Sequence, residues 1–282
     1  MKLDIKNVSK NFGTVEALKD VSMSFETGHI YALLGRNGAG KSTLMNIITK
    51  RIFQSSGNIY LDGEILESDE CLSKIYLMSE ANYFGNIRVS EAIKTTKLFD
   101  ESFDDKEALS LSKSFKLEVS QRIPKLSTGY ASIFKLIMAL CSSSTFVLFD
   151  EPILGLDANH RSVFYKLLLS KFAQKNEEVC YIISTHLIEE VSGLIERAII
   201  IKNGEIVVDG MVETLLKNAL SVSGKLEDIK LACNRARILS IDTVGLVSSA
   251  VVIGEVIDNG NIEINSVDLQ TLFIELTNEG GF

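Results

Sequence analysis

Nine residues near the amino end restrict this chain to a small group of folds. Gly35-Arg36-Asn37-Gly38-Ala39-Gly40-Lys41-Ser42-Thr43 fits the pattern G-x-x-x-x-G-K-[ST], and an apolar run stands on each side of it. This pattern, placed between a buried strand and a helix, is typical of a phosphate-binding loop. The sequence therefore predicts an α/β fold that binds a nucleoside triphosphate.

Each part of this loop has a chemical reason. Gly35, Gly38 and Gly40 allow the backbone to curl, so that successive N–H groups point at an anion. The helix that follows contributes a partial positive charge of roughly half a unit at its first turn. Lys41 is then expected to reach the β- and γ-phosphates, and the Ser42 hydroxyl is expected to bind Mg²⁺.

The composition argues against several other classes of protein. A net charge of −8, with no block of lysine and arginine, argues against a protein that binds nucleic acid. The four cysteines are scattered without C-x-x-C spacing, which favours reduced core residues of a cytosolic protein. The amino end lacks the apolar core of a signal peptide, and we expect no membrane-spanning segment.

Two carboxylates end a short apolar run in the middle of the chain. Phe146-Val147-Leu148-Phe149 precedes Asp150 and Glu151. An apolar run of this length indicates a buried parallel strand, and α/β sheets bind their ligands at the carboxyl ends of such strands. We therefore expect Asp150 to hold Mg²⁺ and Glu151 to deprotonate an attacking water.

A histidine follows a second apolar run. Residues 179–183 are apolar, and the segment Ser184-Thr185-His186 comes directly after them. A histidine just past the end of a central strand can donate to a γ-phosphate and position a water molecule. His186 is therefore a second candidate catalytic residue.

Two further segments are candidates for contact with the nucleotide. Leu126-Ser127-Thr128-Gly129-Tyr130 opens a predicted helix, and a small, hydroxyl-bearing helix start is a potential anion site. Phe12 stands shortly before the phosphate loop, where an aromatic ring can stack on a purine. Covering a sheet edge is an equally good interpretation of Phe12.

The remaining segments suggest how the chain is organised. Residues 87–118 have helical periodicity and predict an inserted helical layer, with helix starts at Ser90 with Glu91 and at Asp104-Asp105. Beyond residue 210 we expect a helix over 211–220, then a hairpin turning at Asn259-Gly260 and a closing helix that starts at Asp268. These elements predict a small α+β appendage.

Four features in this order resemble the ATP-binding cassette ATPase family. They are the phosphate loop, the segment 126–130 shortly before the Asp-Glu strand, a Leu-Asp loop at Asp157 after that strand, and His186. The resemblance covers residues 1 to about 215 and implies a P-loop ABC-type core, with a mixed sheet, flanking helices, an antiparallel β subdomain and a helical insertion. It further implies Mg·ATP as the ligand, Phe12 against adenine, and two cassettes that close face to face. Ser127 and Gly129 of one cassette would then contact the nucleotide on the other, with Asp157 at the interface.

The chain departs from the usual family motifs in three places. Thr128 and Tyr130 stand where the family usually has glycine and glutamine, and Ile133 replaces an arginine. Ser79 and Glu80 stand where a glutamine usually ends the strand at 75–78. We expect these departures to affect turnover more than nucleotide binding.

The resemblance implies the ATP-binding subunit of an ABC transporter, with a domain at 1–215, a helical subdomain at about 85–140 and an accessory domain at 216–282. The partners implied are transmembrane permease subunits and a second ATP-binding subunit, and the location is the cytoplasmic face of the membrane. The carboxy-terminal part resembles extensions found in bacterial exporters and antibiotic-response transporters, which favours export. The permease is expected to dock on the face formed by Ser79 to Arg88 and the helical insertion. Two alternatives are a soluble ABC-type ATPase acting on ribosomes or DNA, and a nucleotide-sensing module without useful hydrolysis.

Overall fold

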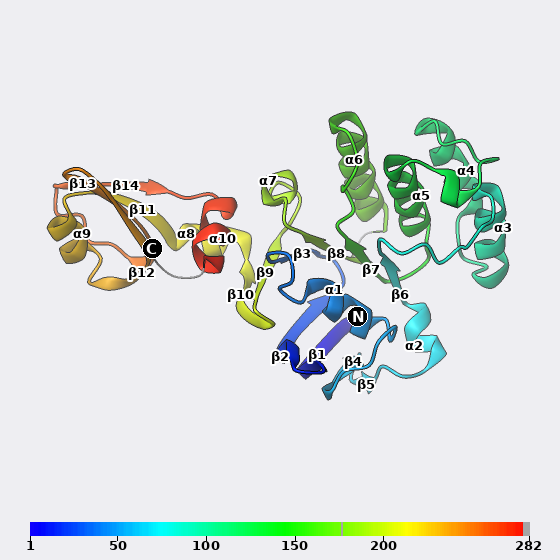
Figure 1. Cartoon of the computed structure of the whole chain (residues 1–282), viewed down its shortest axis with the longest axis horizontal. Helices are drawn as coiled ribbons and strands as arrows, with labels where there is room; N and C mark the ends of the chain where they lie inside the picture. The colour runs from blue at the N-terminus through cyan, green and yellow to red at the C-terminus, as the bar shows by residue number, and fades with distance from the viewer. Residues whose placement is uncertain (176, 279–282) are drawn as a thin grey trace.

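A six-stranded sheet forms the centre of the molecule (Figure 1). The computed structural model describes residues 1–175 and 177–278. The strand order is β10-β9-β3-β8-β7-β6, and all neighbours are parallel except the β9–β10 pair. These strands are β3 (Ile30–Leu34), β6 (Ile75–Met78), β7 (Phe146–Asp150), β8 (Cys180–Thr185), β9 (Arg197–Lys202) and β10 (Glu205–Met211).

The central strands are apolar on both sides because both faces of the sheet are covered. Every residue of β3, β7 and β8 is buried. One face packs against α5 (Thr128–Leu140) and α6 (Ala158–Lys175), and the other against α1 (Lys41–Ile48) and the amino-terminal sheet. Burial on both faces is the usual condition of parallel sheets, and it explains the unbroken apolar runs in the sequence.

The amino-terminal sheet is antiparallel, with the order β2-β1-β4-β5. Its strands alternate buried and exposed residues because only one face packs on the core. Strands β4 and β5 pair antiparallel across a tight turn at Asp62-Gly63. The strands are β1 (Lys2–Phe12), β2 (Val15–Glu26), β4 (Ser56–Leu61) and β5 (Glu64–Ile65).

A helical layer is inserted between β6 and β7, as predicted. The predicted start at Asp104 is confirmed, because its Oδ1 accepts a hydrogen bond from Glu107 N at 2.9 Å. The start predicted at Ser90 is wrong, since Arg88 is the N-cap and its N–H donates to Glu91 Oε2 at 2.8 Å. This part of the chain, with the short helix before it, contains α2 (Asp69–Ser73), α3 (Val89–Phe99), α4 (Asp105–Ser114) and the 3₁₀ turn Ile123–Lys125.

The carboxy-terminal segment carries a third sheet, with the order β12-β13-β11-β14. The predicted hairpin at Asn259-Gly260 is wrong, because β13 and β14 lie on opposite sides of β11 and do not pair with each other. The helix predicted over 211–220 ends early, since β11 begins at Ala219. The elements are α7 (Ile188–Val191), α8 (Val212–Lys217), β11 (Ala219–Gly224), α9 (Leu226–Ala232), β12 (Arg235–Val244), β13 (Val247–Glu255), β14 (Ile262–Ser266) and α10 (Leu269–Thr277).

Helix α10 returns the chain to the central sheet (Figure 1). It begins at the predicted N-cap Asp268, whose Oδ1 accepts from Thr271 N at 2.7 Å. Its apolar face joins the same buried cluster as α7, and Lys202 Nζ donates to Asn278 O at 2.7 Å. The predicted boundary at residue 215 falls inside α8. Within the described ranges, no helix has both the length and the apolar character needed to cross a bilayer.

Candidate active site

The phosphate loop connects β3 to α1, as the sequence predicted. Gly40 has φ of +111°, and a Cβ there would lie 2.8 Å from Ala17 O. A Cβ on Gly35 would lie 2.7 Å from Ile201 O. Both glycines are therefore required by close backbone approaches as well as by the shape of the loop.

Lys41 is the first residue of α1, and its side chain turns back under the loop. The ammonium donates hydrogen bonds to Gly35 O at 2.7 Å and to Arg36 O at 3.3 Å. Burial lowers the pKa of Lys41, while the nearby carboxylates of Glu151 and Asp150 act in the opposite direction. A buried cation at a helix start is well placed to attract an anionic ligand.

Asp150 ends β7, where the residue is 8% exposed. Burial raises the pKa of this carboxyl, and the hydroxyls of Ser42 and Ser184 act in the opposite direction. Its buried Oδ1 has no hydrogen-bond partner among the described residues, which is uncommon for a buried polar atom. A buried, unpaired carboxylate oxygen beside a serine hydroxyl fits the oxygen ligands that Mg²⁺ prefers. The two residues expected to hold the metal therefore suit it chemically.

Glu151 and His186 meet at the carboxyl ends of neighbouring strands. His186 Nδ1 lies 2.9 Å from Glu151 Oε1, and Thr185 Oγ1 donates to Glu151 Oε2 at 3.3 Å. Glu151 has φ of +48°, a left-handed conformation that is uncommon outside glycine and is often found at functional sites. The backbone hydrogen bond from Glu151 N to Ser184 O, at 2.9 Å, helps to hold this conformation.

These side chains share one cavity of about 650 Å³. The phosphate loop contributes Asn37, Gly38, Lys41 and Ser42, and the ends of β7 and β8 contribute Asp150, Glu151 and His186. The loop after β6 supplies the remaining side of the cavity through Ser79, Glu80, Ala81 and Tyr83. Residues predicted from three separate stretches of sequence are thus brought together, with enough volume beside them for a phosphate chain.

Ser127 and Gly129 do not line this cavity within the same chain. Ser127 caps α5, where its hydroxyl accepts a hydrogen bond from Tyr130 N at 3.3 Å. A Cβ on Gly129 would lie 3.0 Å from Gly155 O, so this segment packs closely on the loop that follows Glu151. Asp157 ends that loop, and its carboxylate accepts from His160 N at 2.8 Å.

Phe12 also lies apart from the cavity. It ends β1, is 49% exposed, and has the Lys10 ammonium 4.8 Å from its ring centroid. An exposed ring held by a cation is available for stacking on a ligand. It also lies at the end of a sheet strand, so both interpretations from the sequence stay open.

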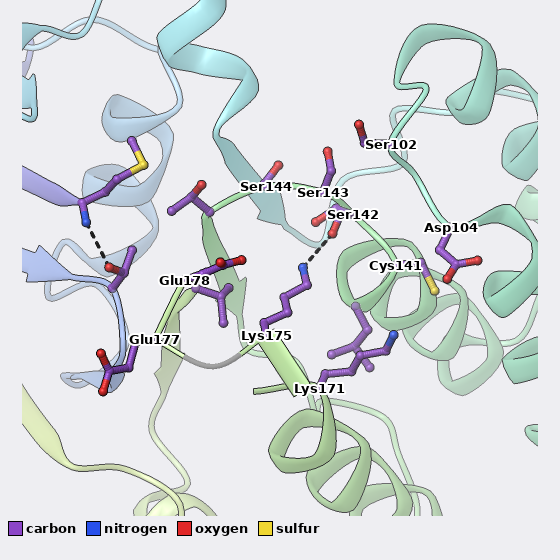
Figure 2. A pocket seen from close by; sticks show the side chains of 15 residues that line it. Ser102, Asp104, Cys141, Ser142, Ser143, Ser144, Lys171, Lys175, Glu177 and Glu178 are labelled. Atoms are coloured by element: carbon purple, nitrogen blue, oxygen red, sulfur yellow. Dashed lines mark hydrogen bonds between the residues drawn. The ribbon is translucent and has the colours of Figure 1, made fainter. Parts of the chain in front are cut away.

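A second cavity, of about 670 Å³, lies at the amino ends of β7 and β8 (Figure 2). It is lined by Ser142, Ser143, Lys171 and Lys175, and Lys175 Nζ donates to Ser142 O at 3.0 Å. None of the residues predicted for the nucleotide lines it. The two cavities are therefore at opposite ends of the central strands.

Sequence reasoning missed two cations that hold the loop after β6. Arg51 donates to Ser79 Oγ at 3.0 Å, and Lys135 Nζ donates to Glu80 O. Neither cation belongs to a recognisable motif. The available signal is the loop itself, whose polar and aromatic residues are typical of an exposed functional segment.

Comparisons with known proteins agree with this geometry. Residues 18–154 match the ABC transporter family. Over 247 residues the chain is 31% identical to the ribose import ATP-binding protein RbsA of Streptococcus agalactiae serotype Ia, covering 81% of this chain and 49% of RbsA. The chain therefore spans about half the length of this curated relative. The ABC transporter ATP-binding protein YtrB of Bacillus subtilis is 26% identical over 250 residues, which cover 86% of this chain and 84% of YtrB.

The fold of this chain is similar to that of a solved ATP-binding cassette. That cassette is a dimer in a post-hydrolysis state bound to ADP and Pi, and it is 25% identical to this chain with a TM-score of 0.64. The likeness covers 74% of this chain and 98% of that cassette. The chain therefore contains an ATP-binding domain of the ABC transporter family, an ABC-type ATPase.

Proposed function

We propose that this chain is the ATP-binding and ATP-hydrolysing subunit of an ABC transporter, with residues 1–215 as the ATP-binding domain and 216–282 as an accessory domain. The observation that carries the proposal is the cavity shared by Lys41, Ser42, Asp150, Glu151 and His186. Hydrolysis of a phosphoanhydride needs positioning and charge stabilisation more than covalent chemistry. These residue types supply both.

In this proposal each residue has one task. The backbone of residues 35–43 and the Lys41 ammonium bind the β- and γ-phosphates, while Ser42 and Asp150 hold Mg²⁺. The metal ion, when bound, neutralises charge on the phosphate oxygens. Glu151 accepts the proton of the attacking water. His186 orients the Glu151 carboxylate through their 2.9 Å contact and faces the γ-phosphate.

We infer that two copies of the cassette, or this one and a different one, close face to face around two ATP molecules. Two features support this inference: Ser127 and Gly129 do not line the cavity of their own chain, and a related cassette was solved as a dimer. In a closed dimer these residues would complete the site of the other cassette.

ATP-driven dimerisation can be tested with Glu151→Gln, which should retain nucleotide binding without turnover. Light scattering should show a dimer of this variant with Mg·ATP and a monomer without it. Lys41→Ala in the same background should stay monomeric, because the phosphates lose their cation. A Glu151→Gln variant that binds ATP and remains a monomer would contradict the inference.

We further propose that a separate transmembrane permease docks on the face from Ser79 to Arg88 and the helical insertion, at the cytoplasmic side of the membrane, and that the transporter exports. Export rests on the resemblance of the carboxy-terminal part to extensions of exporters. Charge reversal at exposed positions of this face, such as Lys94→Glu on α3, should reduce co-purification with the permease while ATP binding by the isolated subunit stays unchanged. Full co-purification and transport would contradict this docking face.

A further inference from the structure

Arg51 connects two parts of the molecule that both border the nucleotide cavity. It follows α1, the helix that begins at the phosphate loop, after a turn in which Lys50 has φ of +54°. Its guanidinium reaches across to the end of β6 and to the loop that follows it.

One planar group makes three contacts there. The guanidinium donates to Ser79 Oγ at 3.0 Å and to Leu77 O at 3.3 Å, and its carbon lies 4.1 Å from the ring centroid of Tyr83. Tyr83 is 61% exposed, so the packing that would otherwise hold an aromatic side chain is largely missing. A lysine cannot reproduce this arrangement, because it lacks both the fork of donors and the flat face.

The same loop also lines the cavity. Ser79, Glu80, Ala81 and Tyr83 line it together with residues of the phosphate loop and the Asp150-Glu151 pair. From the other side, Lys135 on α5 donates to the backbone carbonyl of Glu80. The loop is therefore held by one cation from each of the two layers that border it.

We propose that Arg51 is a positioning residue for hydrolysis, because it fixes the wall that carries Glu80 in the same cavity as Asp150 and Glu151. This inference rests on the proposed hydrolysis at this cavity. This wall lines the cavity that contains the two carboxylates, and Phe12 does not line that cavity. A loosened wall should therefore disturb the reacting end of the nucleotide more than its overall affinity.

Steady-state ATPase kinetics test the catalytic part of the proposal. Arg51→Gln should lower kcat about tenfold and change KM less than about twofold, as expected for lost positioning at the reacting centre. Arg51→Lys should recover less than half of the lost rate, because charge alone does not restore the fork and the stacked face. Arg237→Gln, an exposed arginine on β12, is the matched control. A wild-type kcat in Arg51→Gln, or full recovery by lysine, would overturn the proposal.

A fluorescence measurement tests the positioning part without ATP. The chain contains no tryptophan, so Tyr83→Trp introduces a single reporter on the loop. Adding Arg51→Gln to this reporter protein should raise acrylamide quenching at least twofold, whereas adding Arg237→Gln should not. Unchanged quenching would show that Arg51 does not restrain the loop. Since this readout needs no turnover, failure of the proposed ATPase function remains distinguishable from failure of this inference.

Discussion

His186 Nδ1 lies 2.9 Å from Glu151 Oε1, although 35 positions separate the two residues in the chain. They meet because β7 and β8 are parallel neighbours, and Asp150 at the end of β7 is paired with Ser184 in β8. The contact orients the carboxylate that we propose as the general base. It also means that the two residues act as a unit, so their substitutions should not be additive.

Replacing Glu151 should therefore abolish turnover without preventing binding. Glu151→Gln keeps the size of the side chain but removes its basicity, and the loss of a general base lowers kcat by about 10²–10⁴-fold. His186→Ala should lose a similar amount, and the double variant should lose little more than either one alone. Single-turnover assays with radiolabelled ATP measure the rates. Losses that multiply in the double variant would contradict a coupled pair.

Asp150→Asn should make the folded protein more stable at neutral pH. Burial raises the pKa of Asp150 in the folded chain above its ordinary value of 3.8. At a pH above both the folded-state and the unfolded-state pKa, the ionised carboxylate is therefore less favourable in the folded than in the unfolded chain. The gain in Tm should be full at pH 7.5 and should shrink as the pH falls through the folded-state pKa towards 3.8. Asp242→Asn, on an exposed part of β12, is the control for thermal melts across this pH range. A gain that does not depend on pH would contradict the assignment to this carboxylate.

The two interpretations of Phe12 lead to different results. If its ring stacks on adenine, Phe12→Ala should raise the Kd for ATP about tenfold, since one base–aromatic stack contributes about 1–3 kcal/mol. Phe12→Tyr should bind ATP as the parent protein does. If the ring only covers the sheet edge, both variants should bind ATP equally well, and Phe12→Ala should lower Tm. Isothermal titration with Mg·ATP and thermal melts together distinguish these outcomes.

Gly155→Ala should destabilise the loop that joins Glu151 to Asp157. Gly155 has φ of +79°, and an added Cβ would lie 3.1 Å from Thr128 Cγ2. We expect a loss of about 1–2 kcal/mol in the free energy of unfolding, because alanine is strained in this conformation. Gly85 has a similar φ of +64° with open space around it. Gly85→Ala therefore measures the free-energy cost of the strained backbone without a new side-chain contact. Urea unfolding curves give both values, and equal losses would show that the contact with Thr128 does not matter.

The docking of α10 should weaken at low pH. The hydrogen bond from Thr271 N lowers the pKa of the Asp268 carboxyl in the folded chain. The stabilisation that this cap gives the helix is therefore complete above the unfolded-state pKa of Asp268. It is lost as the pH falls through the folded-state pKa. Asp268→Ala should cost about 1 kcal/mol at pH 7, as for other N-caps. Asp268→Asn keeps the acceptor oxygen and should retain most of the stability. Hydrogen exchange of α10 amides at pH 7 compares the three proteins, and equal protection would contradict the role of the cap.

The central sheet and much of the site could be predicted because they depend on local patterns. The apolar runs at 30–34, 75–78 and 146–149 are strands in the structure, and the side chains that follow them share an edge of the sheet. Asp104, Ser127 and Asp268 were recognisable as helix starts because a cap is a local hydrogen bond. Lys41, Asp150, Glu151 and His186 line one cavity because they follow the carboxyl ends of neighbouring strands.

The errors lie where long-range pairing decides the structure. Asn259-Gly260 has the sequence of a tight hairpin turn, yet the flanking strands pair with β11 instead of with each other. The pairing partner of a strand depends on which edge is free in the folded chain, and no local pattern encodes this. Arg51 was missed for a related reason, since its hydrogen-bond partners are 26 and 28 positions away in sequence. A long side chain that bridges loops leaves no periodic signal.

The strand order β9-β3-β8-β7 also determines when the site can form during synthesis. Lys41 leaves the ribosome more than one hundred residues before Asp150, and β8, which separates their strands in the sheet, follows later still. At elongation rates of roughly 5–20 residues per second, the phosphate loop waits on the order of ten seconds for its partners. During this interval a nascent chain has an apolar strand, β3, with neither neighbouring strand available. The cassette is therefore most exposed to misfolding before residue 185 has been made, and nucleotide can stabilise the fold only after that point.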